Sequence, residues 1–565
     1  MLIPQPKNLE RRTGPGSRHG APCQEKIDPM LGPEQSYRLS IGEDQISIIA
    51  SDAAGVFYAH QTLNQLKREF PESLPAMVIE DSPDFAVRGF MLDISRDKVP
   101  TMATLFALVD LLSELKINQL QLYTEHTFAY REHRVVWQES SPMTGDEIRQ
   151  LDSYCRKRFI ELVPNQNSFG HLERWFKHAP YQHLAEKPEG FSFSWGTRAP
   201  NGFSLNPTDP RSMKFIESLY DELLPNFTSG LFNVGCDETL DLGLGRSKAD
   251  VERRGRERVY FDFLVKIYEA VKRRGKRMMF WGDIILHKPE LLNELPRDII
   301  ALNWGYEADH PFEKEMQAIR NSRVPFYVCP GTSSWCSISG RTDNAIANLQ
   351  NAAKHGIANG ASGYLITDWG DYGHLQYQPV SYIGIAAGAA YSWSYEANRR
   401  ASLEIAIDMH VFADRAEVMT NWLGEFGNIY QCAKEPLSNG SRFFWTLVGG
   451  EDRRKNYQNV TIEEFEQAIK RIDQLLPSLQ KARMDHSDAD LVLAECRNAA
   501  AMLRHACRHG IFLGRGPIKN VDLAGELQKI MAEHRRLWLL RNRPGGLNDS
   551  ITRLSSSLSA YRAKS

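Results

Sequence analysis

Alternating apolar and polar residues mark the first 85 residues as a small unit of their own. Tyr37–Ile41 and Gln45–Ala50 alternate at a period of two, and a short Gly-Glu-Asp connection joins them. This period indicates half-buried strands, and the connection predicts a hairpin. A helical period follows over Ala53–Phe70, whereas residues 8–30 are rich in glycine, proline and charge and are expected to be loop. We therefore predict an N-terminal α+β domain over residues 1–85.

From residue 86 onward, short apolar runs alternate with helical periods. The runs are Val87–Ile94, Asn118–Glu125, Phe159–Pro164, Leu231–Cys236, Arg277–Trp281, Ile299–Trp304, Pro325–Cys329 and Gly363–Trp369. Helical periods lie between most of them, at Thr101–Leu115, Thr144–Arg158, Asp209–Leu224, Glu257–Arg274 and Thr342–His355, and the sixth helix is the least distinct. Eight strands alternating with helices over about 300 residues are typical of a (β/α)8 barrel. We predict this barrel as the catalytic domain, over residues 86–400.

After residue 400 the alternation stops and helical stripes dominate. They are Ser402–Phe412, Ile462–Lys481, Asp488–His509 and Leu523–Leu540. We predict a C-terminal helical domain over 401–565 that serves for packing, or as the interface of a homo-oligomer, rather than for chemistry. The fold class is therefore α/β, a TIM barrel with an N-terminal α+β domain and a C-terminal helical region.

Charge and cysteine usage narrow the class of protein. The formal net charge is -2, which gives no electrostatic footprint for nucleic acid or an anionic membrane. The eight cysteines are scattered without Cys-x-x-Cys pairs, and several lie inside apolar runs, which favours a reducing compartment. Met1–Pro6 has no basic region followed by a long apolar core, and no apolar run has membrane length. We expect a soluble, cytoplasmic protein that binds neither nucleic acid nor a membrane.

The ends of the predicted strands carry the residues with chemical potential, because in such barrels the active site forms where strands end and loops begin. These positions hold Arg88, Asp93, Arg96, Glu125, His126, Asn165, Asn167, His171, Asp237, Glu238, Trp281, Asp283, Trp304, Trp335, Trp369 and Asp371. Indole faces stack on the apolar faces of sugar rings, and sugar hydroxyls need charged or amide partners. Cleavage of a glycosidic bond also needs a carboxylic acid that protonates the leaving oxygen. The combination indicates a carbohydrate site.

Two adjacent carboxylates, Asp237 and Glu238, close the fourth apolar run. Neighbouring like charges repel, so their position at the end of a buried strand favours a functional role. Alone, the pair would fit the acidic first turn of a helix equally well. Their place at the fourth of eight strands favours a catalytic pair.

Structural alternatives exist for the other positions. A single tryptophan near a strand end is more often core than binding platform, although four together make that explanation weak. Arg88 alone would equally fit an ion pair with Asp93 or Glu125. A metal cluster of His126, His171 and Asp237 has no spacing that resembles a ligand motif, and we expect no metal and no cofactor.

Several motifs in order resemble the family-20 glycoside hydrolases, the β-N-acetylhexosaminidases. Leu2–Pro6 and Ser51–Gln65 resemble the family's non-catalytic α+β domain, and Asp81–Arg96 resembles its entry into the barrel. Val163-Pro164 followed by Gly170-His171 resembles the third strand; Gly235-Cys236-Asp237-Glu238 resembles the Gly-Gly-Asp-Glu signature and Trp369-Gly370-Asp371 the Trp-Gly-Glu of the eighth strand. The resemblance covers roughly residues 1–395.

The resemblance implies hydrolysis of terminal β-linked GlcNAc or GalNAc with retention, assisted by the substrate. Glu238 would be the general acid and then the base, and Asp237 would hold the 2-acetamido group whose carbonyl attacks the anomeric carbon. Arg88 and Asp371 would bind sugar hydroxyls. Trp281, Trp304 and Trp369 would wall the pocket.

Other positions are expected around the substrate. These are Glu125, His126, Asn167, His171 and Trp335, the last where the family often has a tyrosine that contacts the acetamido oxygen. An amino-sugar glycoside or oligosaccharide is therefore the expected partner.

The signature also departs from the family pattern. Asn233 and Cys236 stand where the signature has histidine and glycine, and Asn165 and Asn167 stand where the third strand carries two acids. Since an amide cannot carry charge, we expect it not to raise the basicity of His171 as an acid would. Two alternatives stay open: a β-glycosidase for another sugar, using Glu125 or Asp283 as second carboxylate, and a carbohydrate-binding protein without catalysis.

Overall fold

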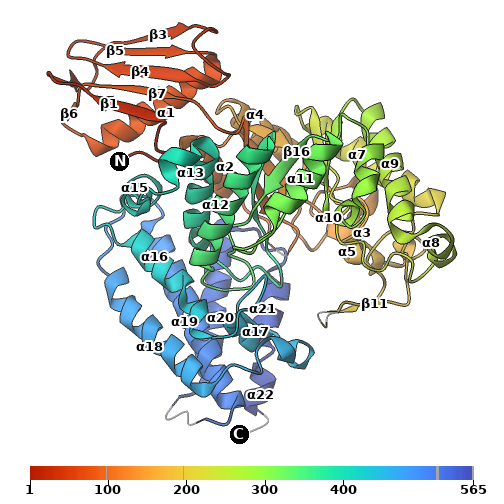
Figure 1. The fold of residues 1–565 in the computed structure, drawn as a ribbon. Coiled ribbons are helices and arrows are strands. Elements are labelled where there is room, and N and C mark those ends of the chain that lie inside the picture. Colours follow the sequence, from red (N-terminus) through yellow and green to blue (C-terminus); the bar gives the residue numbers. More distant parts are fainter. Residues whose placement is uncertain (97, 195, 197, 517–520, 563–565) are drawn as a thin grey trace.

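The computed structural model describes residues 1–96, 98–194, 196, 198–516 and 521–562 (Figure 1). A closed parallel sheet forms the core of the barrel. Within these residues, the sheet has eight strands in the order β10-β9-β8-β17-β16-β15-β14-β13. Their bounds are β8 Val87–Asp93, β9 Gln119–Tyr123, β10 Glu161–Val163, β13 Leu231–Asn233, β14 Arg277–Trp281, β15 Ile300–Trp304, β16 Phe326–Cys329 and β17 Gly363–Asp368. A parallel bridge between Asn165 and Asn233 closes the sheet. The predicted (β/α)8 barrel is confirmed.

Helices surround the barrel and match the predicted periods to within a few residues. They include α2 (Met102–Glu114), α4 (Gly145–Arg156), α7 (Pro210–Leu223), α9 (Arg256–Arg273), α11 (Phe312–Ser322), α12 (Thr342–Asn359) and α13 (Tyr382–Trp393). Side-chain caps mark the starts of α2, α4 and α7. In α4 the Thr144 hydroxyl accepts from the Glu147 amide, and the Glu147 carboxylate accepts from the Thr144 amide. The indistinct sixth helix is α11.

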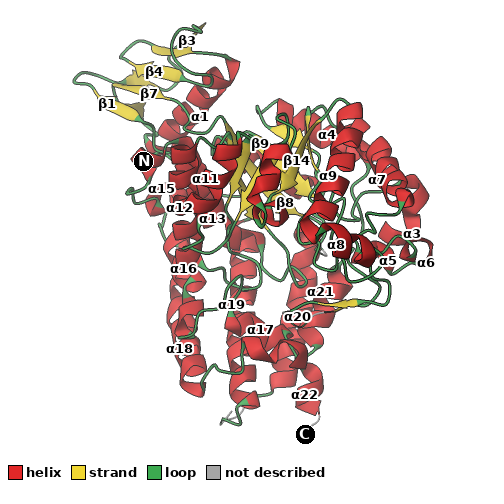
Figure 2. Cartoon of the chain, turned by 45° about the vertical axis from the view of Figure 1, so that its right-hand side comes forward, coloured by secondary structure: helices red, strands yellow, loops and turns green. Residues whose placement is uncertain are grey.

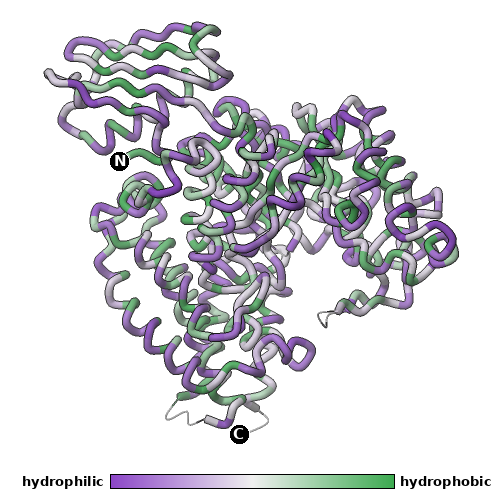
Figure 3. The backbone as a smooth tube through the Cα atoms, in the orientation of Figure 1, coloured by the Kyte–Doolittle hydropathy of each residue, from purple (hydrophilic) through white to green (hydrophobic). Residues whose placement is uncertain are grey.

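Residues 1–85, all of which the structure describes, contain a five-stranded sheet in the order β1-β7-β4-β5-β3, with α1 packed on one face. The strands are β1 (Asn8–Arg11), β3 (Cys23–Ile27), β4 (Tyr37–Ile41), β5 (Ile46–Ala50) and β7 (Met77–Asp81), and α1 spans Ala53–Glu69. The predicted hairpin and helix are confirmed, and Figure 3 shows the alternating hydropathy along the sheet.

The prediction that residues 8–30 form loop is wrong. They contain β1, β3 and the short β2 (Ser17–Arg18), which pairs with β6 (Ser73–Leu74). Every residue of β1 and β3 is exposed, because both strands lie at the edges of the five-stranded sheet. Main-chain hydrogen bonds hold such edge strands, so no apolar alternation marks them in the sequence.

The C-terminal region is helical and extends away from the barrel (Figure 2). Its elements are α15 (Glu404–Ile407), a π turn (Asp408–Phe412), α16 (Met419–Gly427), α17 (Arg442–Val448), α18 (Ile462–Leu479), α19 (Ala489–Leu513), α20 (Leu523–Arg541), α21 (Leu547–Ser555) and α22 (Leu558–Arg562). The end of α20 attaches to the barrel, since the Arg541 carbonyl accepts from the Thr101 amide and the Thr104 hydroxyl at 2.9 and 2.6 Å. Among the helices in the described parts of the chain, none combines the length and apolar character that a membrane span requires.

Arg88 lies at the amino end of the barrel, so its predicted place in the active site is wrong. It is the second residue of β8, about 16 Å from the strand's carboxyl end at about 3.3 Å per residue. Its fully buried guanidinium donates to the carbonyls of Phe85 and Lys116 at 2.7 and 2.9 Å and lies over the rings of Tyr58 and Trp393. Arg88 therefore ties the N-terminal domain to the barrel.

Asp81 is the anion at this junction. Its carboxylate accepts from the Tyr37 hydroxyl at 2.7 Å and from Trp393 Nε1 at 2.8 Å, and it pairs with Lys116 Nζ at 3.2 Å. The Lys116 ammonium, whose pKa burial lowers, also lies 4.3 Å from the centre of the Trp393 ring. Because these groups are buried, losing one partner leaves the others without compensation.

Asp81→Asn is expected to destabilise the protein by about 3–5 kcal/mol, because it leaves the Lys116 cation buried without its anion. The measurement is the free energy of unfolding of the N-terminal domain, followed by denaturant titration. The matched control is Glu80→Gln. Glu80 is the neighbouring residue of β7, and its pair with Arg38 is exposed at the surface, so its loss should cost at most about 1 kcal/mol. Equal effects of the two substitutions would contradict the role of Asp81.

Candidate active site

The turn after β13 directs two carboxylates into the mouth of the barrel. Gly235, Cys236 and Glu238 have φ angles of +66°, +69° and +49°. A Cβ atom at Gly235 would lie 2.6 Å from the side chain of Asn167, so only glycine fits there. Cys236 and Glu238 adopt the same left-handed region without being glycine, and such strain concentrates at functional sites. The Cys236 amide is held by Asn167 Oδ1 at 3.2 Å.

Asp237 is buried and held from two sides. Asn167 Nδ2 donates to its Oδ1 at 2.8 Å, and His171 Nε2 lies 3.1 Å from its Oδ2. Burial alone would raise the pKa of Asp237, but the charge and hydrogen bonds of its partners outweigh it and lower the pKa. Burial likewise opposes protonation of His171, yet Asp237 raises the pKa of the imidazole to about 10. Asp237 thus supplies the charge that the neutral Asn167 cannot give to the histidine.

Glu238 is in the opposite electrostatic situation. Its Oε2 lies 3.6 Å from His171 Nε2, and its amide donates to Asp283 Oδ2 at 3.1 Å. Burial raises the pKa of Glu238; His171 opposes this rise, and Asp237 adds to it. Burial and Asp237 also raise the pKa of Asp283 to about 8. The geometry therefore pairs an ionised Asp237 with a Glu238 that keeps its proton to higher pH, the division that acid catalysis needs.

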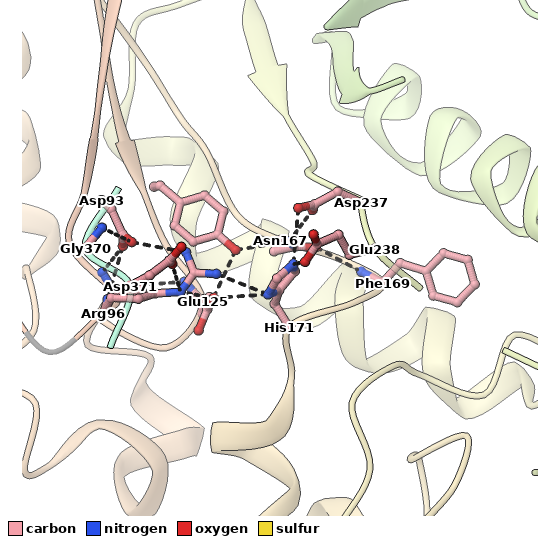
Figure 4. A network of polar contacts seen from close by, with 12 residues as sticks. Asp93, Arg96, Glu125, Asn167, Phe169, His171, Asp237, Glu238, Gly370 and Asp371 are labelled. Carbon is pink, nitrogen blue, oxygen red and sulfur yellow. Dashed lines mark hydrogen bonds and ion pairs between the residues drawn. The ribbon is translucent and has the colours of Figure 1, made fainter. Parts of the chain in front are cut away.

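Arg96 contacts three acidic residues on the side of His171 that faces away from Asp237 (Figure 4). Its guanidinium lies 3.1 Å from Asp93 Oδ2, 3.2 Å from Glu125 Oε1 and 3.8 Å from Asp371 Oδ1. His171 Nδ1 lies 3.2 Å from Arg96 Nη2 and 3.7 Å from Glu125 Oε1. The imidazole can thus accept from the guanidinium when it is neutral and donate to the carboxylate when it is protonated.

Tyr123 connects the two halves of the site. Its hydroxyl donates to Glu125 Oε1 at 3.0 Å and accepts from Asn167 Nδ2 at 3.1 Å. The Arg96 guanidinium lies 4.9 Å from the centre of the Tyr123 ring and 5.2 Å from that of Trp369. Burial raises the pKa of Glu125 to about 7, against the opposing charge of Arg96. A continuous polar network therefore runs through the strand ends.

Aromatic rings lie directly beside this network. Trp369 donates from Nε1 to the Tyr306 hydroxyl at 2.8 Å, and its ring centre lies 6.1 Å from that of Trp281. Trp304 stacks on Tyr306 at 5.2 Å and points Nε1 toward Asp283 Oδ1 at 3.4 Å. Trp281 is almost fully buried, and no hydrogen-bond partner for its Nε1 occurs among the described residues.

Two predicted site residues lie apart from this network. Trp335 is buried behind Tyr306, with its ring edge against that phenol, and donates from Nε1 to Asn439 Oδ1 at 2.8 Å. The phenol beside the tryptophans is therefore Tyr306, and Trp335 supports it from behind. His126 is buried on the side of Arg174 and Lys177, and burial together with these cations lowers the pKa of its ring well below the usual range. Its side chain makes no recorded contact with Asp237 or Glu238 in the described part of the chain.

The sequence places Arg96 at the end of strand one, but the family resemblance gives the sugar-binding role to Arg88. No motif in the sequence singles out Tyr123 or Tyr306. The available signal for Arg96 was its position just after the strand, where side chains reach the mouth of a barrel. Tyr306 follows Trp304 by two residues, a spacing that places both on one face of an extended chain.

The loop after β17 carries Asp371 and is held by the C-terminal region. The three residues Tyr372–His374 all have positive φ angles, of +60°, +92° and +49°. The guanidinium groups of Arg453 and Arg553 lie 4.7 and 5.4 Å from the centre of the Tyr372 ring. Residues far along the chain therefore fix the backbone that presents Asp371.

The cluster of His126, His171 and Asp237, which we considered as metal ligands and set aside, comes together only in part. His171 and Asp237 do meet, but the third group beside them is Glu238 rather than His126, with one ligand atom of each within 4.8 Å of the others. Among these three groups, His171 Nε2 lies 3.1 Å from Asp237 Oδ2 and 3.6 Å from Glu238 Oε2.

The protein is a (β/α)8 barrel whose strand ends carry adjacent carboxylates, a histidine and tryptophans, residue types suited to carbohydrate recognition. Comparison with family models then identifies the family. The catalytic-domain model of glycosyl hydrolase family 20 matches residues 85–363, and the family's domain 2 matches residues 24–82. The chain belongs to this family.

Individual relatives are distant. A β-hexosaminidase of Akkermansia muciniphila is 28% identical over 264 residues, which are 42% of this chain and 51% of that protein. A lacto-N-biosidase of Bifidobacterium bifidum is 24% identical over 286 residues, 48% of this chain and 24% of that protein. The chain thus spans about half or less of the length of these curated relatives. The solved structure of Flavobacterium johnsoniae chitobiase matches 98% of both chains at a TM-score of 0.61 and 15% identity, so the fold likeness extends through the C-terminal helices.

Proposed function

We propose that the protein is a retaining exo-β-N-acetylhexosaminidase that hydrolyses terminal β-linked GlcNAc or GalNAc, without a cofactor. The observation that carries the proposal is the contrast between two adjacent acids: Asp237 is held as a carboxylate by His171 and Asn167, whereas the pKa of Glu238 is raised. One acid can then position an amide while the other transfers a proton.

The chemistry follows from these states. Asp237 accepts a hydrogen bond from the acetamido N–H and so increases the electron density on the amide carbonyl. The carbonyl oxygen attacks the anomeric carbon as Glu238 gives its proton to the leaving oxygen, and a cyclic oxazolinium-type intermediate forms. Glu238, now a carboxylate, takes a proton from the water that reopens the ring with net retention.

The remaining site residues divide into binding and positioning roles. Arg96 and Asp371 bind sugar hydroxyls at the far edge, beside Glu125. The tryptophans and Tyr306 enclose the acetamido group and the sugar face. Asn167 and His171 touch Asp237 and hold its charge and orientation, so we assign them as positioning residues.

A substrate panel tests the proposal against another β-glycosidase. Aryl β-GlcNAc and β-GalNAc should be hydrolysed at least about tenfold faster than the matching aryl β-glucoside and β-galactoside, because only the former carry the internal nucleophile. Faster turnover of the plain hexosides would contradict substrate assistance. Binding of amino sugars without turnover of any glycoside would favour a carbohydrate-binding protein.

We also propose the division into domains 1–85, 86–400 and 401–565, a cytoplasmic location and a homo-oligomer formed through the C-terminal helices. All eight cysteines are free and seven of them are buried, which supports a reducing compartment.

Leu539 and Leu540 expose 51% and 54% of their surface side by side on α20, which supports a contact between subunits at this helix. Light scattering of wild type and Leu540→Glu would test the oligomer.

A further inference from the structure

The edge strand β3 carries polar side chains where its neighbour carries apolar ones. β3 pairs in parallel with β5, with Cys23 opposite Ile46 and Glu25 opposite Ile48. Ile46 and Ile48 are buried in the core beneath α1, and paired residues of neighbouring strands point to the same face. Cys23 and Glu25 therefore face the helix side of the sheet, where the Glu25 carboxylate is unsuited to an apolar core.

His60 of α1 completes this polar group. Its Nε2 lies 2.7 Å from Glu25 Oε1, and one donor atom each of Cys23, Glu25 and His60 lies within 4.8 Å of the others. The other seven cysteines of the chain are buried, so Cys23 is the thiol that solvent reaches. An exposed His–Glu pair alone would contribute little to stability and would need no thiol beside it.

We propose that Cys23, Glu25 and His60 form a Zn²⁺ site on the N-terminal domain, with three protein ligands and water in the fourth position. Thiolate, imidazole and carboxylate are the donors that zinc takes in proteins, and a thiolate disfavours Mg²⁺ and Ca²⁺. Tetrahedral bonds of about 2.0–2.3 Å place ligand atoms roughly 3–4 Å apart, which side-chain rotation achieves from the observed positions. Binding breaks the S–H bond of Cys23, releases its proton to solvent and forms the Zn–S bond, with no change in oxidation state.

The site would join an edge strand to the helix that covers the sheet. β3 pairs with a strand on one side only, so its attachment to the domain is weak apart from that pairing. A metal bridge from β3 to α1 closes the loop between residues 23 and 60 and stabilises the folded domain at zinc concentrations above the dissociation constant. It lies in the N-terminal domain, outside the candidate active site.

The test uses the full-length chain, reduced and treated with a chelator. Zinc chloride alone is the probe, and alkylation of Cys23 by iodoacetamide, quantified by peptide mass spectrometry, is the readout. One equivalent of zinc should slow alkylation more than about tenfold. Cys23→Ser and His60→Gln should each weaken zinc affinity by more than about tenfold, since even groups outside the ligand shell contribute that much. His19→Gln is the matched control, because His19 lies on the same domain with its Nε2 at the Phe70 carbonyl.

Cobalt substitution and hydrolysis separate this site from the barrel. Co²⁺ should give a thiolate charge-transfer absorption that Cys23→Ser abolishes. Zinc held by His171, Asp237 and Glu238 would instead inhibit hydrolysis and leave the alkylation of Cys23 unchanged. That outcome, zinc binding as strong in the two variants as in wild type, or no zinc binding at all, would overturn the proposal.

Discussion

Glu238→Gln is expected to lower kcat on aryl β-GlcNAc by about 10²–10⁴-fold, because the amide cannot protonate the leaving oxygen. The pKa of Glu238 is raised mainly by burial, so the wild-type enzyme should lose activity as the pH rises through that value and its acid form disappears. This alkaline limb should vanish in the variant. Steady-state kinetics over a pH series provide the measurement.

The leaving group supplies the control for this variant. A dinitrophenyl glycoside needs less protonation, so its rate should fall much less than that of a methylumbelliferyl or natural glycoside. A uniform loss over all leaving groups, or an unchanged rate, would remove the assignment of Glu238 as the acid. The thermal midpoint of the variant should stay close to wild type, since glutamine keeps the size and shape of the glutamate side chain.

Asp237→Asn is expected to lower kcat on the same substrates by about 10²–10³-fold. The effect resembles the loss of one preorganised electrostatic contact to a developing charge. The asparagine side chain can still lie beside His171 and Asn167, but it places no negative charge next to the acetamido N–H. The readout is kcat and KM, because a group that acts in the transition state should change kcat more than KM.

The histidine offers an independent readout of the same substitution. Asp237 raises the pKa of His171 to about 10, so removing the carboxylate should bring the imidazole pKa down. An NMR titration of His171 would follow this shift. An imidazole pKa that did not fall, together with unchanged kcat, would contradict the assigned role of Asp237.

The barrel was predictable because each buried parallel strand is a short apolar run between amphipathic helices. The order of strand ends then placed Asp237, Glu238 and Trp369 at one mouth, where the structure finds them. Edge strands were not predictable, since β1 and β3 are held by main-chain bonds and leave no apolar signal.

Errors at the site have a common cause. A sequence shows that a residue lies near a strand, but it does not show whether the side chain makes its contacts at the amino end or the carboxyl end of the barrel. Arg88 lies near the start of β8 and Arg96 just after its end. Only the three-dimensional contacts show that Arg88 joins two domains and that Arg96 faces the carboxylates. Likewise Tyr306 lies beside the tryptophans where Trp335 was expected, because Trp335 packs edge-on behind the Tyr306 ring.

Arg453 and Arg553, which pack on the Tyr372 ring, connect the C-terminal region to the active-site loop. The family match ends at residue 363, yet Arg453 and Arg553 brace the left-handed segment that presents Asp371. The segment that matches the family's catalytic-domain model is therefore shorter than the segment whose contacts support the pocket. A chimera spliced at the end of the barrel would inherit every acid of the site and lose the scaffold that holds one of them.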